Sequence, residues 1–203
     1  MNFCLSHLRN NSSLSGTSIG ILEFNPEVDF LIQMSTLVNP GESFKDRVSE
    51  MDILKLKHKT IKETEKLIDT FNYVIRTTDD FSKIKKQCER ITRKLDFPKR
   101  FSNYYIKPQM VDIIKLDTEF YYKNVRKPLL FIIGGKDKLV NVKYGVGKLE
   151  EFENNFISIK IIENMDHYLT LNEGSWNVEK KSKIREIDDV AVSEIINWIK
   201  KNN

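Results

Sequence analysis

Cysteine and long apolar runs are both scarce in this sequence, and their scarcity excludes several classes of protein. The 203 residues contain two cysteines, Cys4 and Cys88, and neither lies in the C-x-x-C spacing of metal and redox sites. No apolar run approaches the roughly eighteen residues of a membrane span, and the start, MNFCLSHLRN, lacks the basic and apolar regions of a signal peptide. We therefore expect free thiols in a reducing compartment, a cytoplasmic location and no membrane partner.

Glycine and charge of a single sign are also scarce. The eight glycines are few for a fold with many tight turns. The 33 basic and 29 acidic residues give a net charge of +4 and are interspersed, whereas a nucleic-acid-binding face needs clustered basic residues. The densest basic run, KLKHKTIK at 55–62, is followed by Glu63 and Glu65, which balance its charge. We therefore expect a globular protein without a nucleic-acid partner.

Three short apolar runs have the character of buried strands, and two later segments have a helical period. The expected strands lie at 28–35, 128–133 and 156–162. One expected helix spans 143–154, and the C-terminal segment carries branched apolar residues on one helical face, at Val192, Ile195, Ile196 and Ile199. Strand, helix, strand and helix in this order predict βαβ units, which require a parallel sheet covered by helices. The fold class is therefore α/β.

The middle of the chain, from about 42 to 117, is charged and helical in period. One apolar stripe is formed by Leu67, Phe71 and Val74, and a second by Phe81, Ile84, Cys88, Ile91 and Leu95. Asp79 and Asp80 are placed to cap the second helix, and two prolines, Pro98 and Pro108, interrupt the segment after it. This pattern predicts a helical insertion between strands, with the stripes as its core.

Two chemically active residue types come after the last two expected strands. Asp137 comes after 128–133 in GGKD, and His167, with Asp166 beside it, comes after 156–162 in ENMDH. The carboxyl ends of parallel strands meet at one edge of a sheet, where catalytic groups lie. An acid and then a histidine are the second and third members of the Ser…Asp…His order of hydrolases. Capping a following helix is the alternative role for Asp137.

These segments resemble the α/β-hydrolases. RKPLLFIIGGKDKLVNV is similar to the penultimate strand and acid loop of that family, FISIKIIENMDHYLTLNEG to its last strand and histidine loop, and AVSEIINWIKKNN to its closing helix. The resemblance covers the C-terminal two thirds of the fold and is nearest to serine aminopeptidase-like or acyl-thioesterase-like esterases. It implies a partial α/β-hydrolase fold, a mostly parallel sheet flanked by helices. Core parts would lie at 1–41 and 118–203, with a helical cap at 42–117.

The resemblance extends to NSSLSGT, which is similar to the family's nucleophile elbow, G-x-S-x-G-G. It puts the nucleophile at Ser13 and one oxyanion donor at the N–H of Leu14. Asn11 and Ser15 stand where the elbow has glycines, and Gly16 matches its last glycine. The implied triad of Ser13, Asp137 and His167 acts on a small-molecule acyl substrate without a metal or organic cofactor.

The sequence departs from the α/β-hydrolase pattern in two ways, so a second function stays open. Only a dozen residues precede Ser13, among which NFCLSHL can supply one strand, and the loop of the second oxyanion donor has no place. The alternative to a nucleophile role for Ser13 is that of a helix cap or of a residue in a polar terminus. The alternative is a truncated, catalytically impaired hydrolase relative that acts as a binding or oligomerising module. An exposed sheet edge would then join copies into a homo-oligomer.

Overall fold

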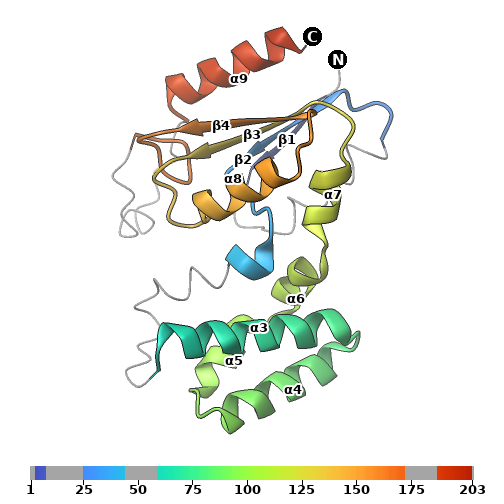
Figure 1. Cartoon of the computed structure of the whole chain (residues 1–203), viewed down its shortest axis with the longest axis vertical. Coiled ribbons are helices and arrows are strands. Elements are labelled where there is room, and N and C mark those ends of the chain that lie inside the picture. Colours follow the sequence, from blue (N-terminus) through green and yellow to red (C-terminus); the bar gives the residue numbers. More distant parts are fainter. Residues whose placement is uncertain (1–2, 8–24, 44–58, 172–186, 203) are drawn as a thin grey trace. The chain divides into compact units, whose positions relative to one another are not determined.

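The structure is a computed structural model that describes residues 3–7, 25–43, 59–171 and 187–202. Its strands are β1 (Phe3–His7), β2 (Phe30–Met34), β3 (Leu129–Gly134) and β4 (Ile157–Ile162). Its helices are α3 (Ile61–Thr77), α4 (Phe81–Lys94), α5 (Lys99–Tyr105), α6 (Pro108–Lys115), α7 (Thr118–Asn124), α8 (Val142–Glu151) and α9 (Asp189–Lys201) (Figure 1). The chain divides into two compact units, one of Met1–Val38 with Thr118–Asn203 and the other of Asn39–Asp117.

The first unit is built on a parallel sheet with the strand order β1-β2-β3-β4. Phe3 pairs with Phe30 at the start of β1 and β2, and Gly134 pairs with Ile162 at the end of β3 and β4. The strand predicted from NFCLSHL is confirmed as β1, and the three later apolar runs are confirmed as β2, β3 and β4. The parallel order brings the carboxyl ends of these strands to one edge of the sheet.

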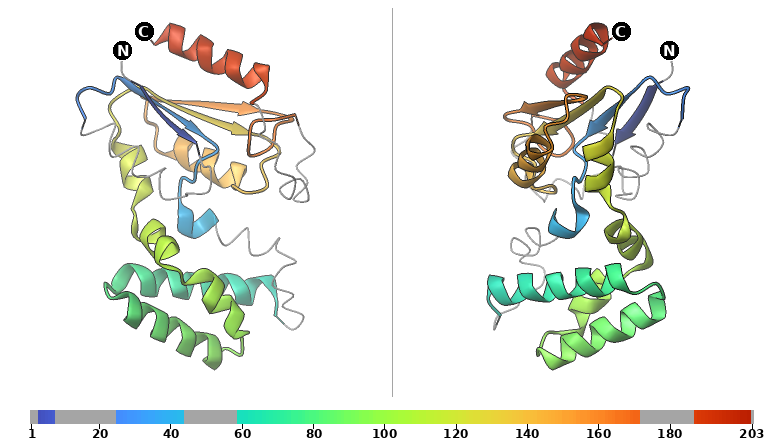
Figure 2. Two further views of the ribbon diagram at one scale, coloured as in Figure 1. Left: turned by 180° about the vertical axis from the view of Figure 1, so that it is seen from behind. Right: turned by 45° about the vertical axis from the view of Figure 1, so that its right-hand side comes forward.

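Helices cover both faces of this sheet. Figure 2 shows α8 and α9 on opposite faces. Phe30, Ile32 and Met34 of β2 face the core that α9 covers, whereas Leu31 belongs to the core under α7 and α8. All residues of β2 and β3 are buried, since both strands lie between two helical layers. This burial explains why β3 is a continuous apolar run and why β2 departs from one only at Gln33.

The buried face of α9 differs from the stripe expected from the sequence. Ile195 and Ile199 pack against the core as expected, together with Trp198, and Ala191 is fully buried. Val192 and Ile196, which the sequence placed on the same face, are 37% and 43% exposed. They lie one residue C-terminal to Ala191 and Ile195, and a helix turns by about 100° per residue, so they are rotated away from the sheet.

The second unit is a helical structure with its own core. Its buried residues come from α3, α4, α5 and α6 and from the short connections between them, and the predicted stripe of Leu67, Phe71 and Val74 lies within it. Phe71 packs against Tyr105 with ring centroids 5.7 Å apart, and the Tyr105 hydroxyl donates a hydrogen bond to Asn72 Oδ1 at 2.8 Å. Burial raises the pKa of Tyr105, so its hydroxyl stays protonated and remains a donor.

The helices of the second unit begin at capping residues or prolines, which favour the start of a helix. Thr60 and Glu63 form a reciprocal capping box at the start of α3. Asp80 caps α4 as expected, because its Oδ1 accepts a hydrogen bond from the Lys83 N–H at 2.7 Å. Pro98 immediately precedes α5, and Pro108 is the first residue of α6. In the part of the chain that the structure describes, no helix has the length and apolar character needed to cross a membrane.

Candidate active site

The acid loop begins where β3 ends. The Gly135 N–H donates a hydrogen bond to the Ile162 carbonyl at 2.9 Å. The Asp137 N–H donates to the Gly134 carbonyl at 3.1 Å, and this second bond closes a tight turn directly after the strand. Asp137 Oδ1 accepts hydrogen bonds from the N–H groups of Leu139 and Val140, at 2.7 and 2.9 Å. These two bonds fix the carboxylate while leaving Oδ2 for another partner.

The histidine loop is held in shape by the residue before the histidine. Asp166 Oδ1 accepts hydrogen bonds from the Tyr168 N–H at 2.9 Å, the Thr170 N–H at 3.2 Å and the Thr170 hydroxyl at 2.9 Å. The loop places Leu169 at a φ of 55°, in the left-handed region that non-glycine residues seldom adopt. Asp166, which the sequence placed only as a neighbour of His167, thus organises the backbone around it.

The two loops bring Asp137 and His167 together. His167 Nδ1 lies 2.9 Å from Asp137 Oδ2, and the two side chains are 8% and 0% exposed. With Asp137 as a carboxylate, Nδ1 carries the proton and donates this bond, which leaves Nε2 of a neutral ring as an acceptor. A buried carboxylate also stabilises the imidazolium that forms when Nε2 takes up a proton. The pair therefore has the geometry of a general base with its orienting acid.

Gly134 permits the close approach of the two loops. A Cβ at this position would lie 2.3 Å from the Met165 carbonyl oxygen and 2.4 Å from that of Asp166. The same Met165 oxygen accepts a hydrogen bond from the Lys136 N–H at 2.9 Å. Sequence reasoning missed this residue as part of the site, although two consecutive glycines after a strand are a signal of close backbone approach.

A buried polar cluster lies at the carboxyl end of β2, at the same edge of the sheet, and was also missed. Gln33 Oε1 accepts hydrogen bonds from the Thr36 hydroxyl, at 3.1 Å, and from the Tyr122 hydroxyl of α7. Burial raises the pKa of Tyr122, which keeps this donor protonated. Ser35 lies among these residues with a φ of 50°. Its buried Oγ has no hydrogen-bond partner within the described ranges. The Gln33 cluster joins the end of β2 to α7.

The remaining site residues expected from the sequence, Ser13 and Leu14, lie outside the described residues. β1 ends at His7, before the stretch that contains them. The structure therefore brings two members of the expected triad together, and the roles of Ser13 and Leu14 stay predictions. Among the described residues, no group of three His, Cys, Asp or Glu side chains is arranged to hold a metal ion.

Comparison with known proteins gives similarity in structure alone. No family model and no curated protein matches this sequence. A Pyrococcus furiosus esterase, Pf2001, is 14% identical with a TM-score of 0.44, over 92% of this chain and 49% of its own. The putative non-heme bromoperoxidase BpoC of Mycobacterium tuberculosis H37Rv is 11% identical with a TM-score of 0.46, over 99% of this chain and 67% of its own.

A third solved structure with similarity is E-2-(acetamidomethylene)succinate hydrolase, which is 12% identical with a TM-score of 0.44, over 98% of this chain and 66% of its own. The chain thus spans from about half to about two thirds of the length of these proteins. At such identities the likeness concerns the fold and not the chemistry of any of the three.

Proposed function

We propose that this chain is a serine hydrolase acting on a carboxylic ester, a thioester or a related acyl bond. The α/β architecture expected from the sequence is confirmed, with parallel strands, flanking helices and a helical insertion between β2 and β3. The observation that carries the proposal is the buried hydrogen bond between His167 and Asp137, formed by loops at the ends of consecutive parallel strands.

In the proposed reaction, Ser13 attacks the acyl carbon while His167 Nε2 takes up its proton. Asp137 holds the imidazole in the tautomer that leaves Nε2 free and stabilises its charged form. The N–H of Leu14 donates to the oxyanion of the tetrahedral intermediate. His167 then returns the proton to the leaving group, and water releases the acyl group from Ser13 by the same steps in a second half-reaction. No step requires a metal or an organic cofactor.

A fluorophosphonate probe tests this proposal, because it reacts with an activated serine and needs no knowledge of the acyl substrate. We expect the probe to label Ser13, Ser13→Ala to abolish labelling, and Asp137→Asn to slow it by at least about 100-fold, since the histidine loses its orienting carboxylate. Ser12→Ala removes a neighbouring hydroxyl and serves as the matched control. Absence of labelling in the wild type, or unchanged labelling in Ser13→Ala, would overturn the assignment.

The position of β1 favours a second candidate, a catalytically impaired relative that binds another copy of itself. Within the described residues β1 pairs only with β2, so its other side presents unpaired backbone groups at the edge of the sheet. Such an edge is a template for pairing with a second chain. A chain that forms a dimer by light scattering and is not labelled by the probe would favour this function over hydrolysis.

A further inference from the structure

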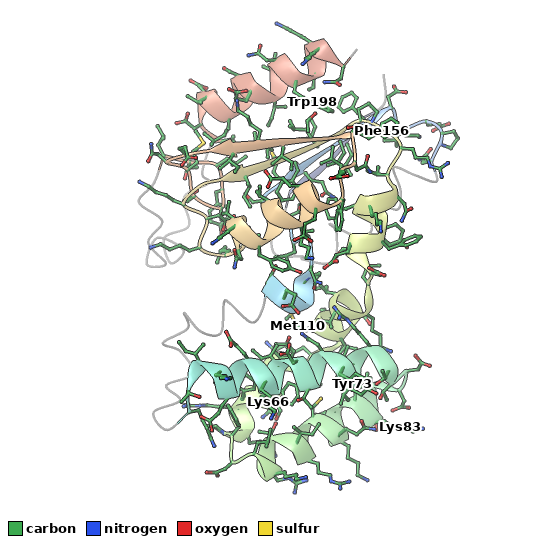
Figure 3. All side chains as sticks on the ribbon, viewed as in Figure 1. Lys66, Tyr73, Lys83, Met110, Phe156 and Trp198 are labelled. Carbon is green, nitrogen blue, oxygen red and sulfur yellow. The ribbon has the colours of Figure 1, made fainter. Side chains whose placement is uncertain are left out.

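The outer face of α4 carries a row of positive charges. The row consists of Lys83, Lys86, Arg90, Arg93 and Lys94, and all five residues are exposed. Their spacing of three or four residues aligns them along one side of the helix. The opposite side is buried and consists of Ile84, Cys88 and Thr92. Figure 3 shows Lys83 projecting outward from the pair formed by α3 and α4. We call this set of five residues the α4 basic row.

The α4 basic row is unusual because it places like charges next to one another. Lys86 lies four residues from Arg90, and Arg90 lies three and four residues from Arg93 and Lys94. Like charges at these spacings destabilise a helix. In the part of the chain that the structure describes, none of the five forms a salt bridge. The helix as a whole has six basic residues and one acidic residue, Glu89.

The neighbouring helix α3 shows the ordinary arrangement within the same unit. Its exposed residues mix both signs, with Lys62 and Lys66 accompanied by Glu63 and Asp69. Figure 3 labels Lys66 on this helix. In α3, Lys66 lies three residues from both Glu63 and Asp69, and these opposite charges stabilise the helix, whereas the like charges of the α4 basic row oppose the formation of α4. An anionic partner that neutralises the α4 basic row would remove this repulsion.

We propose that the α4 basic row binds an acidic helical segment of another protein. From Lys83 to Lys94 the row extends about 16 Å, or about three helical turns. A helix with carboxylates at spacings of three and four residues presents a row of matching pitch and length. Acidic residues mark both ends of the row, with Asp80 before it and Asp96 after it. A short acidic helix fits between these carboxylates.

The same observations disfavour other anionic partners. A continuous anionic surface, such as a charged bilayer, would meet Asp80 and Asp96 as well as the cations. The apolar side of α4 is packed into the core of its unit, so it is not available to enter a bilayer. Among the described residues, the exposed side of α4 carries no aromatic ring on which nucleic-acid bases could stack.

Fluorescence anisotropy with two synthetic peptides tests the proposal. One peptide is a helix with glutamates at spacings of three and four residues, and the other has the same composition in an order that disperses the glutamates around the helix. The full-length protein is compared with three variants, Arg90→Glu, Arg90→Lys and Lys66→Glu. The last has the same change of charge in the same unit and serves as the matched control. Vesicles containing phosphatidylserine and a single-stranded RNA serve as alternative probes.

We expect the aligned peptide to bind at least about 10-fold more tightly than the dispersed one, with an affinity that falls as salt rises. Arg90→Glu should weaken binding by at least about 10-fold, whereas Arg90→Lys and Lys66→Glu should change it by less than about threefold. Equal binding of both peptides, equal losses in Arg90→Glu and Lys66→Glu, or tighter binding of the vesicles or the RNA would overturn the proposal.

Thermal unfolding separates a loss of binding from a loss of folding. Arg90→Glu converts the like-charge neighbours Lys86, Arg93 and Lys94 into opposite-charge neighbours, so its melting temperature should equal or exceed that of the wild type. A variant that is more stable and binds the aligned peptide less well is the expected signature of the α4 basic row. A lower melting temperature would contradict the repulsion from which the proposal starts.

Discussion

At Gly134 the backbone of the histidine loop passes directly over the end of β3, which leaves no room for a side chain. An alanine Cβ would lie 2.3 Å from the Met165 carbonyl oxygen, a backbone atom that cannot rotate away. We expect Gly134→Ala to lower the free energy of unfolding by about 1–3 kcal/mol. Urea denaturation measures this loss. The variant should also displace His167 from Asp137 and so slow labelling by the fluorophosphonate probe.

Gly147 supplies the matched control, because it lies within α8 and a Cβ added there meets no atom within 4 Å. Gly147→Ala should therefore raise the free energy of unfolding by about 0.5–1 kcal/mol, since alanine favours the helix. Opposite signs for the two substitutions are the expected result. A Gly134→Ala variant as stable as Gly147→Ala would contradict the close approach of the two loops.

The positions of Asp137 and His167 were predictable from the sequence, whereas the contacts that hold them were not. Chain order and the common edge of parallel strands bring the two loops together, and both signals are present in the sequence. The shape of the histidine loop depends on three hydrogen bonds to Asp166 and on a positive φ at Leu169. A leucine gives no sequence signal for that conformation, so this part of the site required the structure.

At the scale of the element, the burial of Cys88 on the inner side of α4 predicts how its thiol reacts. Burial raises the pKa of this thiol to about 12, so it remains protonated at neutral pH, and the thiolate is the reactive form. In a Cys4→Ser background, Cys88 should react with a disulfide reagent such as dithionitrobenzoate only on unfolding. The labelling rate should therefore rise steeply with urea, in parallel with the loss of helical circular dichroism.

Labelling of native Cys88 at pH 8 as fast as labelling of the urea-unfolded chain would contradict the packing of α4 on its own unit. Ser82→Cys, at an exposed position in the first turn of the same helix, is the control. With Cys88 also replaced by serine, it should react quickly in the native state.

The helices and strands were largely predictable because their apolar periods are strong. The strands at 30–34, 129–134 and 157–162 and the helix at 142–151 lie within one or two residues of their expected bounds, apart from the C-terminal end of the helix. The charge of α4 was not foreseen. The five cations of the α4 basic row do not form one consecutive run in the sequence, and only the helix gathers residues three and four positions apart onto one side.

At the scale of the whole molecule, the chain has separate cores in its two units. One core consists of residues from 67 to 114 in the unit Asn39–Asp117, and two more lie on the faces of the sheet in the other unit. Phe71 belongs to the first and Phe131 to the second, and both are fully buried. Because the packing neighbours of each ring lie within its own unit, the two units are expected to respond separately to damage.

We therefore expect Phe71→Ala and Phe131→Ala each to cost about 3–5 kcal/mol, but in different parts of the chain. Hydrogen–deuterium exchange with peptide resolution measures where protection is lost. Phe71→Ala should increase exchange chiefly in α3 to α6, and Phe131→Ala chiefly in β2, β3 and β4, so that each variant is the control for the other. A uniform loss of protection over both units in either variant would show instead that the chain unfolds as a single cooperative structure.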